Sequence, residues 1–88
     1  MAYQAEVVVL DPIGLHARPA GQIVKFVKEG GHDVKIGPNT DELVAGNSAL
    51  RLMAMKVNTG SSLLVVVETD DEELGKSVVD QIQEFLKG

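Results

Sequence analysis

The sequence predicts an α+β fold, an open-faced β-sandwich in which three helices cover one face of a four-stranded antiparallel sheet, in the order βαββαβα. Two observations support this. Segments with strand-type and helix-type spacing of apolar residues alternate along the chain. The two middle strands are separated only by a short turn, so they form an antiparallel hairpin. Helices gathered on one face of such a sheet bury the apolar sides of both.

The first strand and the first helix are predicted from the pattern over residues 3–28. Residues 3–10 begin with alternation and end in four apolar residues, which is typical of a strand. A break containing proline and glycine follows. Apolar residues then recur at helical spacing over residues 17–28, with Pro19 in the first turn, where its missing N–H matters little. Gly30 and Gly31 end the helix.

A hairpin and a short helix follow. Residues 32–37 and 42–45 alternate as short strands around a Gly-Pro-Asn-Thr turn. Residues 49–55 are predicted to be a short helix, for which Asn47 or Ser48 serves as the N-terminal cap.

The last strand and helix have the clearest patterns. Residues 61–68 contain the longest aliphatic run, which predicts a strand buried on most sides. Residues 69–72 fit a capping box that starts at Thr69. The helix after it has apolar residues at helical spacing, namely Leu74, Val78, Val79, Ile82 and Leu86.

The composition excludes several classes of protein. A chain of 88 residues has room for one hydrophobic core, so we expect a single domain over residues 1–88. Without cysteine there is no disulfide framework and no thiolate metal site. A net charge of −5 argues against nucleic acid as the main partner. Neither a signal peptide nor a membrane-length apolar run is apparent, which favours a cytoplasmic protein that is not embedded in a membrane.

Residues 14–20 are the segment most suited to chemistry. His16 stands at the start of the predicted first helix, where unpaired N–H groups and the helix dipole stabilise an anion. Such a place favours a neutral, nucleophilic imidazole. The N–H groups of Ala17 and Arg18, with the Arg18 guanidinium, would then hold the oxygens of a phosphoryl group carried by the ring.

The alternative is that His16 is an ordinary residue at a helix start. No second histidine, carboxylate cluster or phosphate-binding loop stands nearby in the sequence to complete a catalytic site. His32 opens a predicted strand without any partner motif, and we assign it no role.

The run Gly-Leu-His-Ala-Arg-Pro-Ala over residues 14–20 resembles the active-site segment of the HPr family, the histidine-containing phosphocarriers of the bacterial phosphoenolpyruvate-dependent sugar phosphotransferase system. The resemblance extends to the order of elements, the chain length and the second-helix region. It implies that phospho-enzyme I phosphorylates His16 on Nδ1, giving a pros-phosphohistidine, and that the group passes to a histidine of an enzyme IIA domain. Arg18 would contact the phosphoryl group, and Ala17 would contribute its backbone N–H.

The resemblance also implies that the protein has no metal or organic cofactor, and we expect a monomer. Ser48 matches the serine that HPr kinase/phosphorylase modifies in Gram-positive members, and a helix N-terminus suits a phosphate. The competing interpretation is a plain N-cap. Ala49 and Arg51 depart from the Gram-positive pattern around that serine.

The family docks its partners on an exposed apolar patch around the second helix. By alignment, Ala49, Leu50 and Met53 are expected to be exposed docking residues, and Ala20 is expected to dock partners with them. Arg51 would lie at the rim of this patch, and Leu52 and Met55 are better candidates for the core. Methionine suits a surface that receives several partners.

Three other functions remain open at this point. A paralogous carrier with the same chemistry would serve nitrogen regulation or dihydroxyacetone phosphorylation. A purely regulatory protein would bind a transcription factor through phospho-Ser48, but the pair of His16 and Arg18 argues against this. A ligand-binding α/β sandwich is disfavoured because no ligand-specific motif is present.

Overall fold

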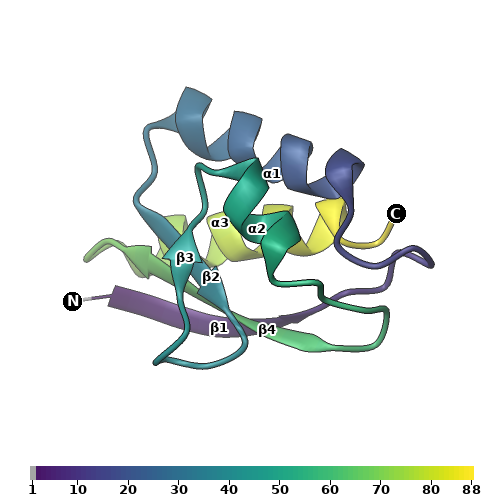
Figure 1. The fold of residues 1–88 in the computed structure, drawn as a ribbon. Coiled ribbons are helices and arrows are strands. Elements are labelled where there is room, and N and C mark those ends of the chain that lie inside the picture. The colour runs from purple at the N-terminus through teal and green to yellow at the C-terminus, as the bar shows by residue number, and fades with distance from the viewer. Residues whose placement is uncertain (1) are drawn as a thin grey trace.

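The computed structural model describes residues 2–88, which form an open-faced sandwich in the predicted order βαββαβα (Figure 1). The elements are β1 (Ala2–Val8), α1 (Ala17–Gly30), β2 (Val34–Gly37), β3 (Val44–Ala45), α2 (Ala49–Ala54), β4 (Ser62–Glu68) and α3 (Glu72–Phe85). The four strands form one antiparallel sheet in the order β1-β4-β2-β3, and the helices lie on one face of it. The predicted fold class is confirmed.

The position of β4 between β1 and β2 explains its apolar sequence. Ala2 pairs with Glu68 and Val8 with Ser62, while on the other side Val34 pairs with Val67. Residues that alternate toward the helices are fully buried, and even Val66, on the opposite face, is buried. Because strands flank β4 on both sides, neighbouring side chains limit the exposure of its residues even on the face without helices.

The edge strand β1 is fixed to α3 at the end that leads into the loop before α1. The Val8 N–H donates to Oε1 of Gln83 at 2.9 Å, and Nε2 of Gln83 donates to the Val8 carbonyl at 2.8 Å. One amide side chain therefore satisfies both backbone groups of Val8, which an edge strand would otherwise leave unpaired.

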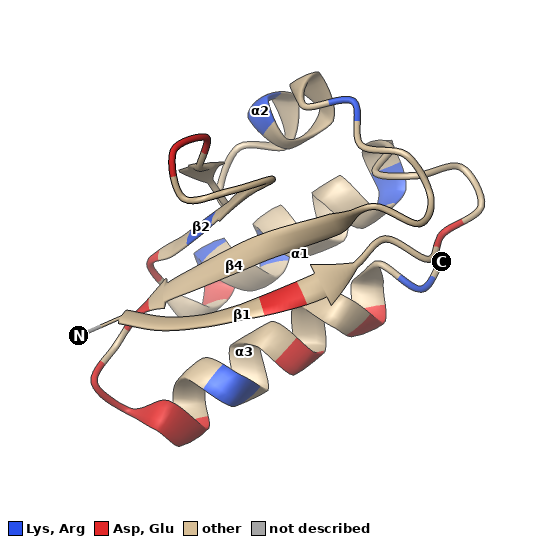
Figure 2. Cartoon of the chain, turned by 90° about the horizontal axis from the view of Figure 1, so that it is seen from below, with Lys and Arg blue, Asp and Glu red and all other residues tan. Residues whose placement is uncertain are grey.

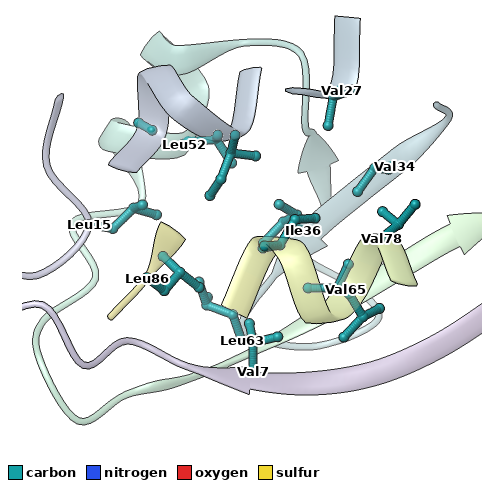
Figure 3. Close-up of a cluster of buried hydrophobic side chains, with 14 of the residues drawn as sticks. Val7, Leu15, Val27, Val34, Ile36, Leu52, Leu63, Val65, Val78 and Leu86 are labelled. Atoms are coloured by element: carbon teal, nitrogen blue, oxygen red, sulfur yellow. The ribbon is translucent and has the colours of Figure 1, made fainter. Parts of the chain in front are cut away.

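The hydrophobic core lies between the sheet and the three helices (Figure 3). Every helix contributes to it, and so do Leu15 and Leu86, which flank the first and last helices. Its buried residues include Val7, Leu15, Ile23, Val27, Val34, Ile36, Leu52, Leu63, Val65, Val78, Ile82 and Leu86. The core is aliphatic, as the composition requires, and it holds both ends of the loop between β1 and α1 in place.

The structure corrects several predicted boundaries. β1 ends at Val8 instead of residue 10, and β3 is only two residues long. The capping box at Thr69 is wrong: Asp71 is the N-cap of α3 and its carboxylate accepts the Leu74 N–H at 3.1 Å. The Thr69 hydroxyl instead accepts the Asp71 N–H and precedes the cap. The C-terminal stop of α1 is confirmed, because Gly31 adopts a left-handed conformation with φ 64°.

Candidate functional site

His16 occupies the N-cap position of α1, with an extended backbone and a side chain that makes no capping hydrogen bond. Leu15 before it is buried in the core, and its N–H donates to the Val57 carbonyl at 3.0 Å. Gly14 has φ 87°, and a Cβ there would lie 2.6 Å from the Val57 oxygen, so only glycine fits this close approach. The His16 side chain is 28% exposed. The fold thus presents a half-exposed imidazole at the start of a 14-residue helix.

Asp11 is the direct partner of His16. Its Oδ2 lies 2.9 Å from Nε2 of the imidazole, and its Oδ1 accepts the Ile13 N–H at 2.9 Å. Asp11 is only 4% exposed. The Ile13 N–H, followed by the hydrogen bond from His16, holds the pKa of the Asp11 carboxyl below its ordinary value. A charged carboxylate therefore lies against one nitrogen of the ring.

The backbone of Asp11 is held by two distant parts of the chain. The Leu86 carbonyl accepts the N–H groups of both Leu10 and Asp11, at 2.9 and 2.8 Å. The Thr59 hydroxyl donates to the Asp11 carbonyl. The loop that carries Asp11 is consequently tied to the C-terminal end of α3 and to the turn before β4.

The other predicted phosphate-binding groups lie beside His16. Ala17 and Arg18 are exposed in the first turn of α1, where backbone N–H groups have no intrahelical acceptor. Arg18 is also close enough to contribute to the lowered pKa of Asp11. In the part of the chain that the structure describes, Nδ1 of His16 has no hydrogen-bond partner. The arrangement leaves one ring nitrogen, a helix N-terminus and a guanidinium facing solvent.

The predicted docking residues divide into three groups. Leu50 is 77% exposed on α2, whereas Ala49 and Met53 are half-buried against the core. Ala20 is wrong as a docking residue, because it is 0% exposed and packs in the core, so its side chain is inaccessible to a partner.

Three further predictions about α2 can be compared with the structure. Leu52 is fully buried, as expected. Met55 is half-buried and packs at the margin of the core instead of inside it. Arg51 is exposed, in keeping with a position at the rim.

Ser48 and His32 occupy structural positions. The Ser48 hydroxyl accepts the Arg51 N–H at 3.3 Å and caps α2. His32 is half-buried, and its ring centroid lies 5.1 Å from that of Phe26. The capping role of Ser48 is therefore present in the structure.

Charge is unevenly distributed over the molecule. Figure 2 shows the acidic residues concentrated on α3 and the turn before it, whereas Lys and Arg lie mainly on α1, α2 and the segment after α2. The surface that includes His16 is therefore less acidic than the net charge of −5 suggests.

The comparison with known proteins agrees with the geometry of the site. The sequence profile of the family described as "PTS HPr component phosphorylation site" matches residues 3–88. The chain belongs to the HPr family. It is 35% identical over 74 residues to the phosphocarrier protein HPr of Borreliella burgdorferi, covering 84% of this chain and 85% of that one. It is 37% identical over 75 residues to the HPr of Treponema pallidum, covering 84% and 83%.

A solved HPr structure has the same architecture. The crystal structure of an HPr from Bacillus anthracis superimposes with a TM-score of 0.77 at 25% identity, covering 96% of this chain and 95% of that chain. As a member of the HPr family, the chain is a phosphocarrier of the phosphotransferase system and interacts with enzymes of that system. Among residues 2–88, no helix is long and apolar enough to cross a membrane.

Asp11 is the residue that sequence reasoning missed. In the sequence, Asp11 is simply part of the break after the first strand, and no pattern there predicts a carboxylate beside His16. The available signal was an Asp-Pro pair five residues before the histidine, which is too general to indicate a contact. The hydrogen bonds from Leu86 and Thr59 that position this loop come from parts of the chain far away in sequence.

Proposed function

We propose that His16 accepts a phosphoryl group from phospho-enzyme I on Nδ1 and passes it to a histidine of an enzyme IIA domain during coupled sugar uptake and phosphorylation. The carrier would act as a monomer in the cytoplasm. The observation that carries the proposal is the placement of a half-exposed imidazole at the N-terminus of α1, with Nε2 hydrogen-bonded and Nδ1 without a protein partner among residues 2–88.

The surroundings of Nδ1 suit a phosphoryl group. Once it is attached, its oxygens lie near the first N–H groups of the helix, which include those of Ala17 and Arg18. The Arg18 guanidinium adds charge-assisted hydrogen bonds to the same oxygens. The site is open to one side, so each protein partner supplies the rest of the transition-state environment.

The exposed part of α2 is the proposed docking surface for both partners. We define it as Ala49, Leu50 and Met53, with Arg51 at its rim. Leu50 is the most exposed large apolar residue of the described chain. An apolar surface that contains methionine adapts to different partner surfaces.

The decisive experiment is phosphorylation by purified enzyme I with Mg²⁺ and phosphoenolpyruvate. We expect an acid-labile, base-stable adduct with the mass of one phosphoryl group, and its transfer onward to an enzyme IIA. His16→Ala should abolish the adduct, whereas the matched variant His32→Ala should retain it. Labelling of the His16 variant, or none of the wild type, would refute the proposal. Parallel reactions with enzyme I paralogues of nitrogen regulation and of dihydroxyacetone phosphorylation would assign the branch.

Regulation at Ser48 is a separate proposal, supported by its place at the N-terminus of α2. Incubation with HPr kinase/phosphorylase and ATP tests it, with Ser48→Ala as the control. Absence of phosphoserine at residue 48 would leave Ser48 with its capping role alone.

A further inference from the structure

Asp11 is the only buried charged side chain among the described residues, and it lies against the nucleophile. We infer that Asp11 is a positioning residue for phosphoryl transfer: it selects the His16 tautomer whose lone pair is on Nδ1, and it offsets the positive charge that the ring gains when phosphorylated. The inference rests on the proposed function of His16.

The orientation of the carboxylate follows from its two contacts. The backbone N–H of Ile13 can only donate, so Oδ1, at 2.9 Å from it, is committed as an acceptor. That contact turns Oδ2 toward Nε2 of His16, also at 2.9 Å. Because an ionised carboxylate only accepts, Nε2 must carry the proton of the neutral ring, and Nδ1 then holds the lone pair.

The transfer step balances without moving a proton. The Nδ1 lone pair forms a bond to the phosphorus atom, while the bond from phosphorus to the donor histidine nitrogen breaks and its electron pair returns to that nitrogen. Nε2 keeps its proton throughout, so the phosphorylated ring carries a positive charge. The Asp11 carboxylate lies beside the protonated nitrogen, and the onward transfer reverses the same changes.

Two variants of Asp11 distinguish the positioning role from a purely structural one. The next outcomes are those expected if Asp11 selects the tautomer. In Asp11→Asn, the amide oxygen must stay on the Ile13 N–H, so the amide NH₂ faces Nε2 and donates to it. Nε2 then becomes an acceptor, and the proton moves to Nδ1, which blocks the nucleophile. In Asp11→Ala, the ring loses its partner but neither tautomer is imposed. A residue that only supports the loop would tolerate asparagine, which keeps the Ile13 hydrogen bond, better than alanine.

The experiment combines ¹⁵N NMR of the imidazoles, at a pH where the rings are neutral, with single-turnover phosphorylation by phospho-enzyme I. In the wild type we expect the proton of His16 on Nε2, and in Asp11→Asn on Nδ1, with the signals of His32 unchanged as an internal reference. One hydrogen bond shifts an equilibrium by on the order of tenfold. The transfer rate should therefore fall about tenfold in Asp11→Ala and about a hundredfold in Asp11→Asn.

The matched control is Asp33→Asn, which removes the same charge from an exposed position just before β2 and should keep the wild-type rate. Backbone NMR spectra report whether each variant is folded, and the wild-type tautomer tests the inference even if a variant is not. A wild-type His16 protonated on Nδ1, or Asp11→Asn transferring faster than Asp11→Ala, would overturn it. Failure of the wild type to accept a phosphoryl group would refute the proposed function instead, without altering the tautomer result.

Discussion

Two leucines on α2 allow the proposed docking role of this helix to be tested separately from its role in folding. Leu50 is 77% exposed, and Leu52, two residues along the same helix, is 0% exposed. We predict that Leu50→Ala weakens binding to enzyme I and leaves the fold intact. Fully burying a leucine side chain contributes about 1.5–3 kcal/mol. Covering the exposed part of Leu50 therefore contributes about 1–2 kcal/mol, so its removal should raise the Kd about 5- to 30-fold.

The stability of the same variant should hardly change. Alanine keeps the helical propensity of the position, and surface substitutions usually alter the free energy of unfolding by less than about 0.5 kcal/mol. Leu52→Ala is the matched control with the opposite expectation. It opens a cavity in the core and should cost about 2–5 kcal/mol of stability, while the folded fraction keeps the wild-type Kd.

Urea unfolding measures the free energy of unfolding, and NMR titration of the ¹⁵N-labelled protein with enzyme I measures the Kd. The titration is carried out at a temperature where Leu52→Ala is folded. If Leu50→Ala binds enzyme I as tightly as the wild type, α2 does not form the docking surface. If Leu50→Ala unfolds at a clearly lower urea concentration than the wild type, the Leu50 side chain supports the fold, and docking and folding are not separate.

Three other predictions concern the loop and the caps. Because the pKa of Asp11 is lower in the folded protein than its ordinary value of 3.8, the ionised carboxylate stabilises the fold at pH values above 3.8. This contribution is lost as the pH falls through the lower pKa of the folded state, so in Asp11→Ala the free energy of unfolding, measured with urea from pH 6 downward, should fall less steeply with acid. An unchanged pH dependence contradicts this. Gly14→Ala forces a Cβ to 2.6 Å from the Val57 oxygen at a φ of 87°, so both thermal stability and the rate of phosphorylation should fall. A wild-type rate would show that the loop can move aside. Ser48→Ala removes the cap of α2 and should cost about 0.5–2 kcal/mol in urea unfolding, while phosphorylation of His16 by enzyme I continues.

The fold and the candidate nucleophile are predictable from the sequence because both depend on local patterns. The alternation of strand and helix spacing specifies the order of elements, and His16 and Arg18 stand within a single run of residues. The error at Ala20 was avoidable, because Ala20, Ile23 and Val27 follow helical spacing and must share one face.

The error at the cap of α3 has another physical cause. Thr69 and Asp71 both offer side-chain oxygens that accept N–H groups, and the sequence does not say which of them stands at the helix start. The structure shows that the Asp71 carboxylate takes the cap position, with two acidic residues behind it in the first turn. Only the path of the backbone decides which of these two acceptors caps the helix.

The hydrogen-bond partner of His16 cannot be found in this way, because its position depends on contacts distant in sequence. Asp11 reaches Nε2 only because the C-terminal end of α3 holds Leu10 and Asp11 by their N–H groups. This link also connects α3 to the site, because the carbonyl at its C-terminal end holds the backbone that carries the Asp11 carboxylate. The net charge of −5 is carried largely by that helix, whereas the surface of α1 and α2 combines a helix N-terminus with arginine (Figure 2). A partner that approaches His16 therefore meets a surface that is less acidic than the net charge of the whole chain suggests.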